Sequence, residues 1–301
     1  MIFQQWTTVP WKPSDRACPL RRDPMHHPLT FPPFPTDHMK DILCATDFSP
    51  VSDNALRHAL ALAERMGSKV TLLHVLGRKE RTEEQRAKAS AAMAQQIGNM
   101  GSADHVTPLL LEGEFIDRIA EETAKDHAFM VSGTHGPQGL RQNLFGADIL
   151  KLVRRSSIPT LVVQANSPVR PTLDKIVLPV AAHATVGKLV DAVCALARAH
   201  ASEVHVFQLM RPNEQPSDEL LANKVMMLNR LQEEKIRHVE ANEPFVEFSV
   251  GFAIATIKYA SRIEAGAIAI MAHASEEYRY IADAEKERLL TNDALIPVLC
   301  A

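Results

Sequence analysis

The chain contains 301 residues, 46% of them apolar, and its formal net charge at pH 7 is −3. This length is enough for two ordinary domains, and this charge gives no electrostatic reason to expect binding to nucleic acid or to an anionic membrane. No apolar run approaches the ~20 residues that span a bilayer, and no segment has the pattern of a secretory signal. The four cysteines are far apart in the sequence. We therefore expect a cytoplasmic protein that works in a reducing setting.

Residues 1–38 differ in composition from the rest of the chain. They contain eight of the nineteen prolines and both tryptophans. Proline at this density, with neither helical nor strand periodicity, predicts a disordered extension. His26 and His27 are adjacent, but no distant ligand is spaced to complete a metal site with them, so we predict none.

Strands and helices alternate between residues 39 and 165, which we predict to be the first domain. Short apolar runs predict five strands, at 42–45, 70–76, 106–111, 129–132 and 160–163. Continuously apolar strands are typical of parallel sheets that are covered on both faces. Strands that alternate with helices favour an α/β fold with a doubly wound parallel sheet and right-handed crossovers.

The carboxyl ends of two of these strands carry the candidate site. Thr46 and Asp47 follow the first strand, and Gly133 ends the fourth. Gly136 and Gly146 continue the glycine-rich stretch before the next helix. Backbone N–H groups at a helix N-terminus bind phosphate, and glycine lets the phosphate approach closely. Because ligands of doubly wound sheets bind beyond the strand ends, we predict an anion site here. The spacing is neither that of a P-loop nor that of the dinucleotide fingerprint.

Each of these features also has a structural explanation. Asp at the position of Asp47 commonly caps the N-terminus of a helix, and the glycines could serve tight turns alone. His135, inside the glycine stretch, has no Ser, Cys or Asp nearby in the sequence with which to act as a catalytic base. We therefore predict a structural or capping role for His135.

The same order of elements returns in residues 174–301, after a linker at 166–173. The strands of this second predicted domain are expected at 175–178, 204–209, 245–252, 267–271 and 296–299. The apolar stripe of its long second helix is Leu221, Val225, Leu228 and Leu231. His273 lies 138 residues after His135, and Pro297 lies 138 residues after Pro159. A repeat of this length indicates a duplicated domain.

The second copy lacks the chemistry of the first. Ala181 replaces Asp47, and side chains replace the bare backbone of the glycines at Met271, Ala274 and Ala284. The acidic residues nearby, which would repel a phosphate, are Glu276, Glu277, Glu285 and Glu287. We predict that this half is degenerate as a binding site and is structural or regulatory.

Both halves resemble the universal stress protein family, arranged in tandem. Residues 42–49 are similar to the opening strand and acidic turn of the family, and residues 73–75 to the end of its second strand. Gly133-Thr134-His135-Gly136, followed after nine residues by Gly146, resembles the signature of the ATP-binding branch. The resemblance covers residues 40–165 well and residues 174–301 weakly.

By this resemblance, each half would be a five-stranded, Rossmann-like parallel sheet. Asp47, in the turn that Thr46 begins, and Val75 would flank adenine and ribose. Gly133 and Gly136 would line the phosphate path, and Gly146 would open the helix that caps it. The implied ligand is ATP or another adenine nucleotide, with or without Mg²⁺.

One position departs from the ATP-binding branch. Ala147 stands where that branch has Ser or Thr. The loss of a hydrogen bond to a phosphate oxygen, about 1.5–3 kcal/mol, predicts ATP binding that is weaker by about one to two decades. A nucleotide with fewer phosphates would be less affected.

The resemblance implies a stress-response sensor or signalling protein whose shape or choice of protein partner depends on a nucleotide. The family pairs two domains through their last strands, so the strands at 160–163 and 297–299 would pair within this chain, which leaves a further homodimer open. We find no general base, no catalytic cluster and no metal site, and expect at most slow ATP hydrolysis. The alternative is a dimerising interaction scaffold that binds no nucleotide.

Overall fold

The computed structural model describes residues 40–77, 82–101, 103–134, 149–182, 186–210, 215–244, 251–273 and 279–301. The predicted extension at residues 1–38 lies outside these ranges. No helix within them is both long and apolar enough to cross a membrane.

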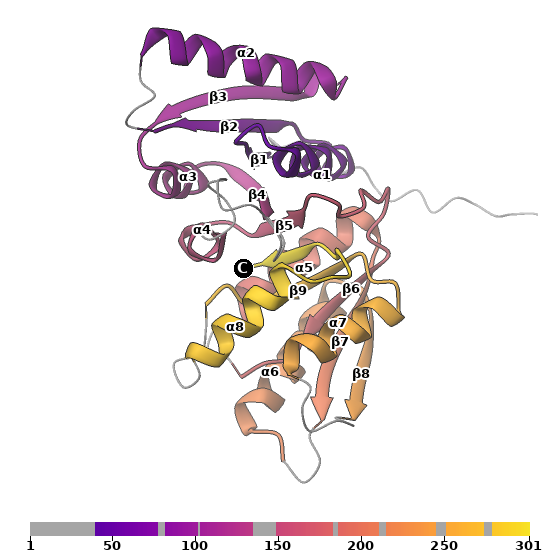
Figure 1. Cartoon of the computed structure of the whole chain (residues 1–301). Helices are drawn as coiled ribbons and strands as arrows, with labels where there is room; N and C mark the ends of the chain where they lie inside the picture. Colours follow the sequence, from indigo (N-terminus) through magenta and orange to yellow (C-terminus); the bar gives the residue numbers. More distant parts are fainter. Residues whose placement is uncertain are drawn as a thin grey trace, which may run out of the picture. The chain divides into compact units, whose positions relative to one another are not determined.

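Strands and helices alternate in both halves of the chain, as Figure 1 shows. The elements of the first half are β1 (Asp41–Ala45), α1 (Pro50–Met66), β2 (Val70–Leu76), α2 (Glu83–Asn99), a short 3₁₀ turn η1 (Ala103–His105), β3 (Val106–Glu112), α3 (Phe115–Thr123), β4 (His127–Thr134), α4 (Ile149–Arg155) and β5 (Thr160–Gln164). Those of the second half are β6 (Lys175–Pro179), α5 (Gly187–His200), β7 (Glu203–Met210), α6 (Asp218–Glu233), β8 (Arg237–Pro244), α7 (Phe252–Arg262), β9 (Ala267–Ile270), α8 (Arg279–Leu290) and β10 (Val298–Cys300).

The strands form one sheet in the order β3-β2-β1-β4-β5-β10-β9-β6-β7-β8. Within each half every pairing is parallel, so the predicted doubly wound α/β fold is confirmed. The two halves meet where β10 pairs with β5 in antiparallel register, with Leu299 opposite Leu161. The pairing of the last strands that the resemblance implied therefore occurs within the chain.

Alternation along each strand divides the core between the two faces of the sheet. Ile42 and Cys44 pack on the face that α1, α2, α5 and α6 cover. Leu43 and Ala45 pack on the face that α3, α4, α7 and α8 cover. Strands buried on both faces explain the continuously apolar runs in the sequence.

Local sequence signals account for the ends of α1 and the start of α2. Ser49 caps α1 by accepting from Ser52 N, Pro50 takes the first turn, and Gly67 closes the helix in the left-handed conformation at φ 65°. Thr82 and Gln85 form a reciprocal capping box at the start of α2.

The third strand of the second half differs from our prediction. We predicted it at 245–252, of which residues 245–250 lie outside the described ranges. The strand that takes the third position is β8, from Arg237 to Pro244, and Phe252 begins α7. The edge position of β8 explains the error, because an edge strand is paired on one side only and can be polar. Its sequence, RHVEANEP, lacks the continuous apolar run on which the prediction relied, because Val239 and Ala241 stand between polar residues.

The predicted core stripe of α6 was also wrong in part. Leu221 and Val225 are 42% and 56% exposed, whereas Lys224 and Met227 are buried. Lys224 Nζ donates to Gln208 Oε1 and to Asn242 Oδ1, both at 2.8 Å. A buried ammonium that finds such partners is satisfied, so the helix turns this polar residue inward.

Candidate functional site

The candidate site lies at the carboxyl edge of the first half, where β1 and β4 are neighbours. The helix that follows β1 packs on one face of the sheet, and the helix after β4 packs on the other. The two connections therefore leave in opposite directions, which makes this a topological switch point. Thr46 and Asp47 follow β1, and Gly133 lies near the end of β4.

Thr46 is the centre of a buried polar network. Its hydroxyl donates to Gln96 Oε1 at 2.9 Å, lies 3.1 Å from Ser52 Oγ and accepts from Phe48 N at 3.0 Å. The side chain is 1% exposed. Gln96 in turn donates to Asp53 Oδ1 at 2.6 Å, which joins α2 to the first turn of α1. The Thr46 side chain thus holds the turn in place. Because this side chain is buried in the network, a ligand would contact Thr46 through main-chain atoms.

Asp47 stabilises the turn with its own carboxylate. Asp47 Oδ1 accepts from Ser49 N at 3.0 Å, a hydrogen bond across two residues that is typical of an Asx turn. The N-terminal cap of α1 is Ser49, so Asp47 is not the capping residue. Asp47 is half-buried.

Phe48 has a strained backbone at the same turn. Its φ is 63°, in the left-handed region that costs energy for a bulky side chain. Its ring lies 4.3 Å from the ring of His74 on β2. His74 Nδ1 lies 2.8 Å from Thr46 O, and because a carbonyl only accepts, His74 carries a hydrogen on Nδ1. The ring contact and this hydrogen bond hold the strained turn against β2.

Val75 and Gly133 are both buried in the protein. Val75 is 4% exposed and its side chain packs in the core on the side of α3 and α4. A Cβ atom at Gly133 would lie 2.4 Å from Val51 Cγ1 and 3.1 Å from Val51 O. The first turn of α1 therefore occupies the space beside Gly133. Gly136, Gly146, His135 and Ala147 lie outside the described residues.

Two residues that position the site, Gln96 and His74, were missing from the sequence prediction. Gln96 is 50 positions from Thr46, and no spacing rule relates the two. His74 could have been noticed as the polar interruption of an apolar strand. Across the described ranges, no group of three or more His, Cys, Asp or Glu side chains is arranged to hold a metal ion.

Residues 38–164 match the universal stress protein family. These residues form a universal stress protein domain. None of the curated proteins compared with the chain matches it.

Solved structures extend the likeness beyond that domain. A universal stress protein from Archaeoglobus fulgidus has 13% identity and a TM-score of 0.63, over 87% of this chain and 96% of that chain. A protein of unknown function from Pseudomonas aeruginosa has 20% identity and a TM-score of 0.54, over 87% of this chain and 92% of that chain. At these identities the likeness shows the fold alone, and its extent includes the second half.

A third solved structure is a universal stress protein in complex with cAMP. It has 18% identity and a TM-score of 0.33, and the match covers 42% of this chain and 98% of that chain. The cAMP is a ligand of that protein.

The second half places different groups at the matching strand ends. Ala181 follows β6 at the position of Asp47, and its carbonyl accepts from Asn223 Nδ2 at 2.9 Å. Met271 follows β9 at the position of Gly133 and is 9% exposed. The acidic side chain and the bare backbone of the universal stress protein domain are therefore both missing at these two positions.

Proposed function

We propose that the universal stress protein domain binds an adenine nucleotide at the switch point between β1 and β4, and that the chain acts as a stress-response sensor or signalling protein. The observation that carries this proposal is the position of Asp47. Its carboxylate stands at the edge where doubly wound sheets bind ligands. The turn that presents it is held by hydrogen bonds to α2, to β2 and within the turn itself.

A turn held in this way is suited to binding. Thr46 ties it to α2 and α1, and His74 ties it to β2. Because the protein fixes the turn before a ligand arrives, little conformational entropy is lost on binding. The strain at Phe48 also fits a functional turn, because strained residues are concentrated at such sites.

The ligand we favour is an adenine nucleotide, with Asp47 and Val75 beside adenine and ribose and with Gly133, Gly136 and Gly146 on the phosphate path. Ala147 removes a hydroxyl from that path, so we expect ADP or AMP to compete well with ATP. Ala147→Ser should then tighten ATP binding by about tenfold. We expect turnover to be limited to slow ATP hydrolysis.

Isothermal titration of the full chain with ATP, ADP and AMP, with and without Mg²⁺, tests the proposal. One site per chain, accompanied by a rise in the unfolding temperature, would support it. No heat and no thermal shift with any of the three would overturn it.

The alternative function is an interaction scaffold without a nucleotide. Two observations favour it. Val51 fills the space beside Gly133, so packing alone explains the glycine. The two halves also already pair through β5 and β10. A scaffold would present its surfaces to a protein partner or to a second copy of the chain. The same titration separates the two functions, because a scaffold gives no signal with nucleotides.

A further inference from the structure

A carboxylate of the protein itself sits at the start of α7. Ala253 N, in the first turn of that helix, donates to Glu285 Oε2 from α8. Gly251 precedes the helix and has no side chain with which to cap it. A Cβ atom at Gly251 would lie 2.5 Å from Glu285 Oε1. Glu285 therefore lies directly against the backbone at the helix N-terminus, in space that glycine leaves open.

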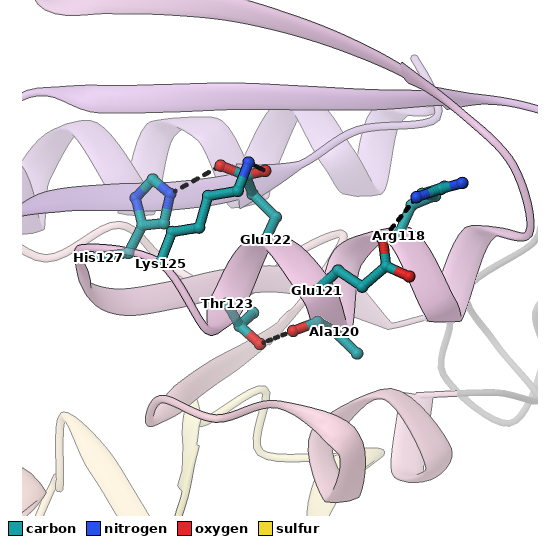
Figure 2. A network of polar contacts seen from close by, with 7 residues as sticks. All are labelled: Arg118, Ala120, Glu121, Glu122, Thr123, Lys125 and His127. Atoms are coloured by element: carbon teal, nitrogen blue, oxygen red, sulfur yellow. Dashed lines mark hydrogen bonds and ion pairs between the residues drawn. The ribbon is translucent and has the colours of Figure 1, made fainter.

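The first half has the opposite charge in the matching place. Gly113 also stands just before a helix, and a Cβ atom there would lie 2.5 Å from Nε of Arg118. This Nε donates to Glu112 O at 2.8 Å, and Figure 2 shows Arg118 on α3 next to Glu121. A cation thus covers the glycine of the first half, and an anion covers that of the second.

Glu285 occupies the position in the second half that Ala147 occupies in the first. Counted back from the proline that precedes the last strand of each half, Glu285 is the counterpart of Ala147. By the family resemblance, that position contacts the phosphate in the ATP-binding branch. The second half therefore carries a fixed negative charge where a nucleotide-binding half would carry a neutral hydroxyl.

We infer that Glu285 is an internal anion that closes the second half to phosphorylated ligands. The N-terminus of a helix carries a partial positive charge, which the carboxylate neutralises. An incoming phosphate would have to displace this carboxylate and would also meet its negative charge. Leu289 and Leu290 of α8 are buried in the same apolar core as Ala260 of α7. This shared packing fixes α8 beside α7 and so holds the carboxylate in place. This inference does not depend on whether the first half binds a nucleotide.

The test compares four full-length proteins: wild type, Glu285→Ala, Glu285→Gln and Glu287→Ala. Glu287 is an exposed acidic residue on the same helix, so its variant controls for the loss of one negative charge. Thermal unfolding is followed while inorganic phosphate is titrated at constant ionic strength. Phosphate serves as the probe because it supplies the missing charge without a base or sugar.

We expect Glu285→Ala to lower the unfolding temperature by about 4 °C relative to Glu287→Ala. Phosphate should restore at least half of that loss, because it can take the vacated place. Glu285→Gln should lower the temperature less and respond no more than wild type, because its amide still covers the helix end. Any phosphate binding by the first half is common to all four proteins and cancels in the comparison.

Two outcomes would overturn the inference. One is an unfolding temperature of Glu285→Ala equal to that of Glu287→Ala. The other is a phosphate response of Glu285→Ala no larger than that of wild type. If Glu285→Ala does not fold, Glu285→Gln is compared with Glu287→Gln, and equal unfolding temperatures of that pair would count against the role of the charge.

Discussion

Val51 occupies the space that a side chain at position 133 would need. Its Cγ1 atom would lie 2.4 Å from a Cβ atom at Gly133, and its carbonyl oxygen 3.1 Å away. The contact joins the first turn of α1 to β4 at the switch point. Glycine is therefore required here for packing, whether or not a ligand is bound, and its presence does not by itself argue for a nucleotide.

The contact predicts the effect of Gly133→Ala. An added methyl group forces Val51 and the start of α1 to move, which should lower the free energy of unfolding by about 1–3 kcal/mol. Urea unfolding measures this loss. In the background of Val51→Ala the cost should fall but not vanish, because the carbonyl contact remains. Equal costs in the two backgrounds would show that Val51 Cγ1 is not the obstacle.

Asp47→Asn tests the proposed ligand role of Asp47 separately from its structural role. Asparagine keeps an oxygen that accepts from Ser49 N, so the turn and the unfolding temperature should be preserved. The change removes the negative charge that, in the proposed site, lies beside the base and ribose. We expect nucleotide affinity to fall about 10- to 100-fold, as measured by isothermal titration. Unchanged affinity would remove Asp47 from the site.

Asp47→Ala is the companion variant. It removes both the acceptor for Ser49 N and the charge, so stability and affinity should fall together. Affinity loss in Asp47→Asn without stability loss, set beside the combined loss in Asp47→Ala, identifies a ligand contact.

The sequence predicted the fold well because the fold depends on local patterns. Apolar runs such as residues 70–76 lie within the sheet as buried parallel strands, and the alternation with helices sets the doubly wound order. The pairing of β5 with β10 followed from the family resemblance rather than from the residues themselves, and its antiparallel direction was not predicted. The polar edge strand β8 was missed because an edge position relaxes the apolar pattern on which strand prediction relies.

The site was predicted less completely because it depends on contacts between distant residues. Asp47 and Gly133 could be placed at strand ends from the sequence. The partner of Thr46 is Gln96, on another element, and the obstacle beside Gly133 is Val51, whose side chain gives no sequence signal. Packing of this kind becomes visible only once the helices are placed on the sheet.

Thr46→Val tests the buried network behind the turn. Valine has a similar shape but leaves Phe48 N and Gln96 Oε1 without the hydroxyl that they contact. Buried polar groups that lose their partner cost about 1–3 kcal/mol. Thr107→Val is the matched control, because Thr107 is exposed and its change should alter the free energy of unfolding by less than about 0.5 kcal/mol. Equal effects of the two variants in urea unfolding would contradict the network.

His200 on α5 makes stability depend on pH. It is 6% exposed, and its Nδ1 accepts from Leu173 N at 3.4 Å, so the neutral ring is the one that fits. Burial lowers the pKa of His200 from 6.5 to about 4; the positive charge of Arg65 acts in the same direction, and the negative charge of Asp174 opposes it.

Because the folded pKa lies below the unfolded one, the unfolded chain takes up the proton first as pH falls. The stability that the neutral ring provides is complete above about pH 6.5 and is lost progressively down to about pH 4, by about 2–3 kcal/mol in total. Urea unfolding between these pH values should show this slope. His200→Asn keeps an acceptor near the position of Nδ1 and cannot titrate, so the slope should become shallower. The slope that remains has a second source in His58, whose pKa is also lowered by burial. If wild type and His200→Asn lose stability in parallel, His200 does not carry this pH dependence.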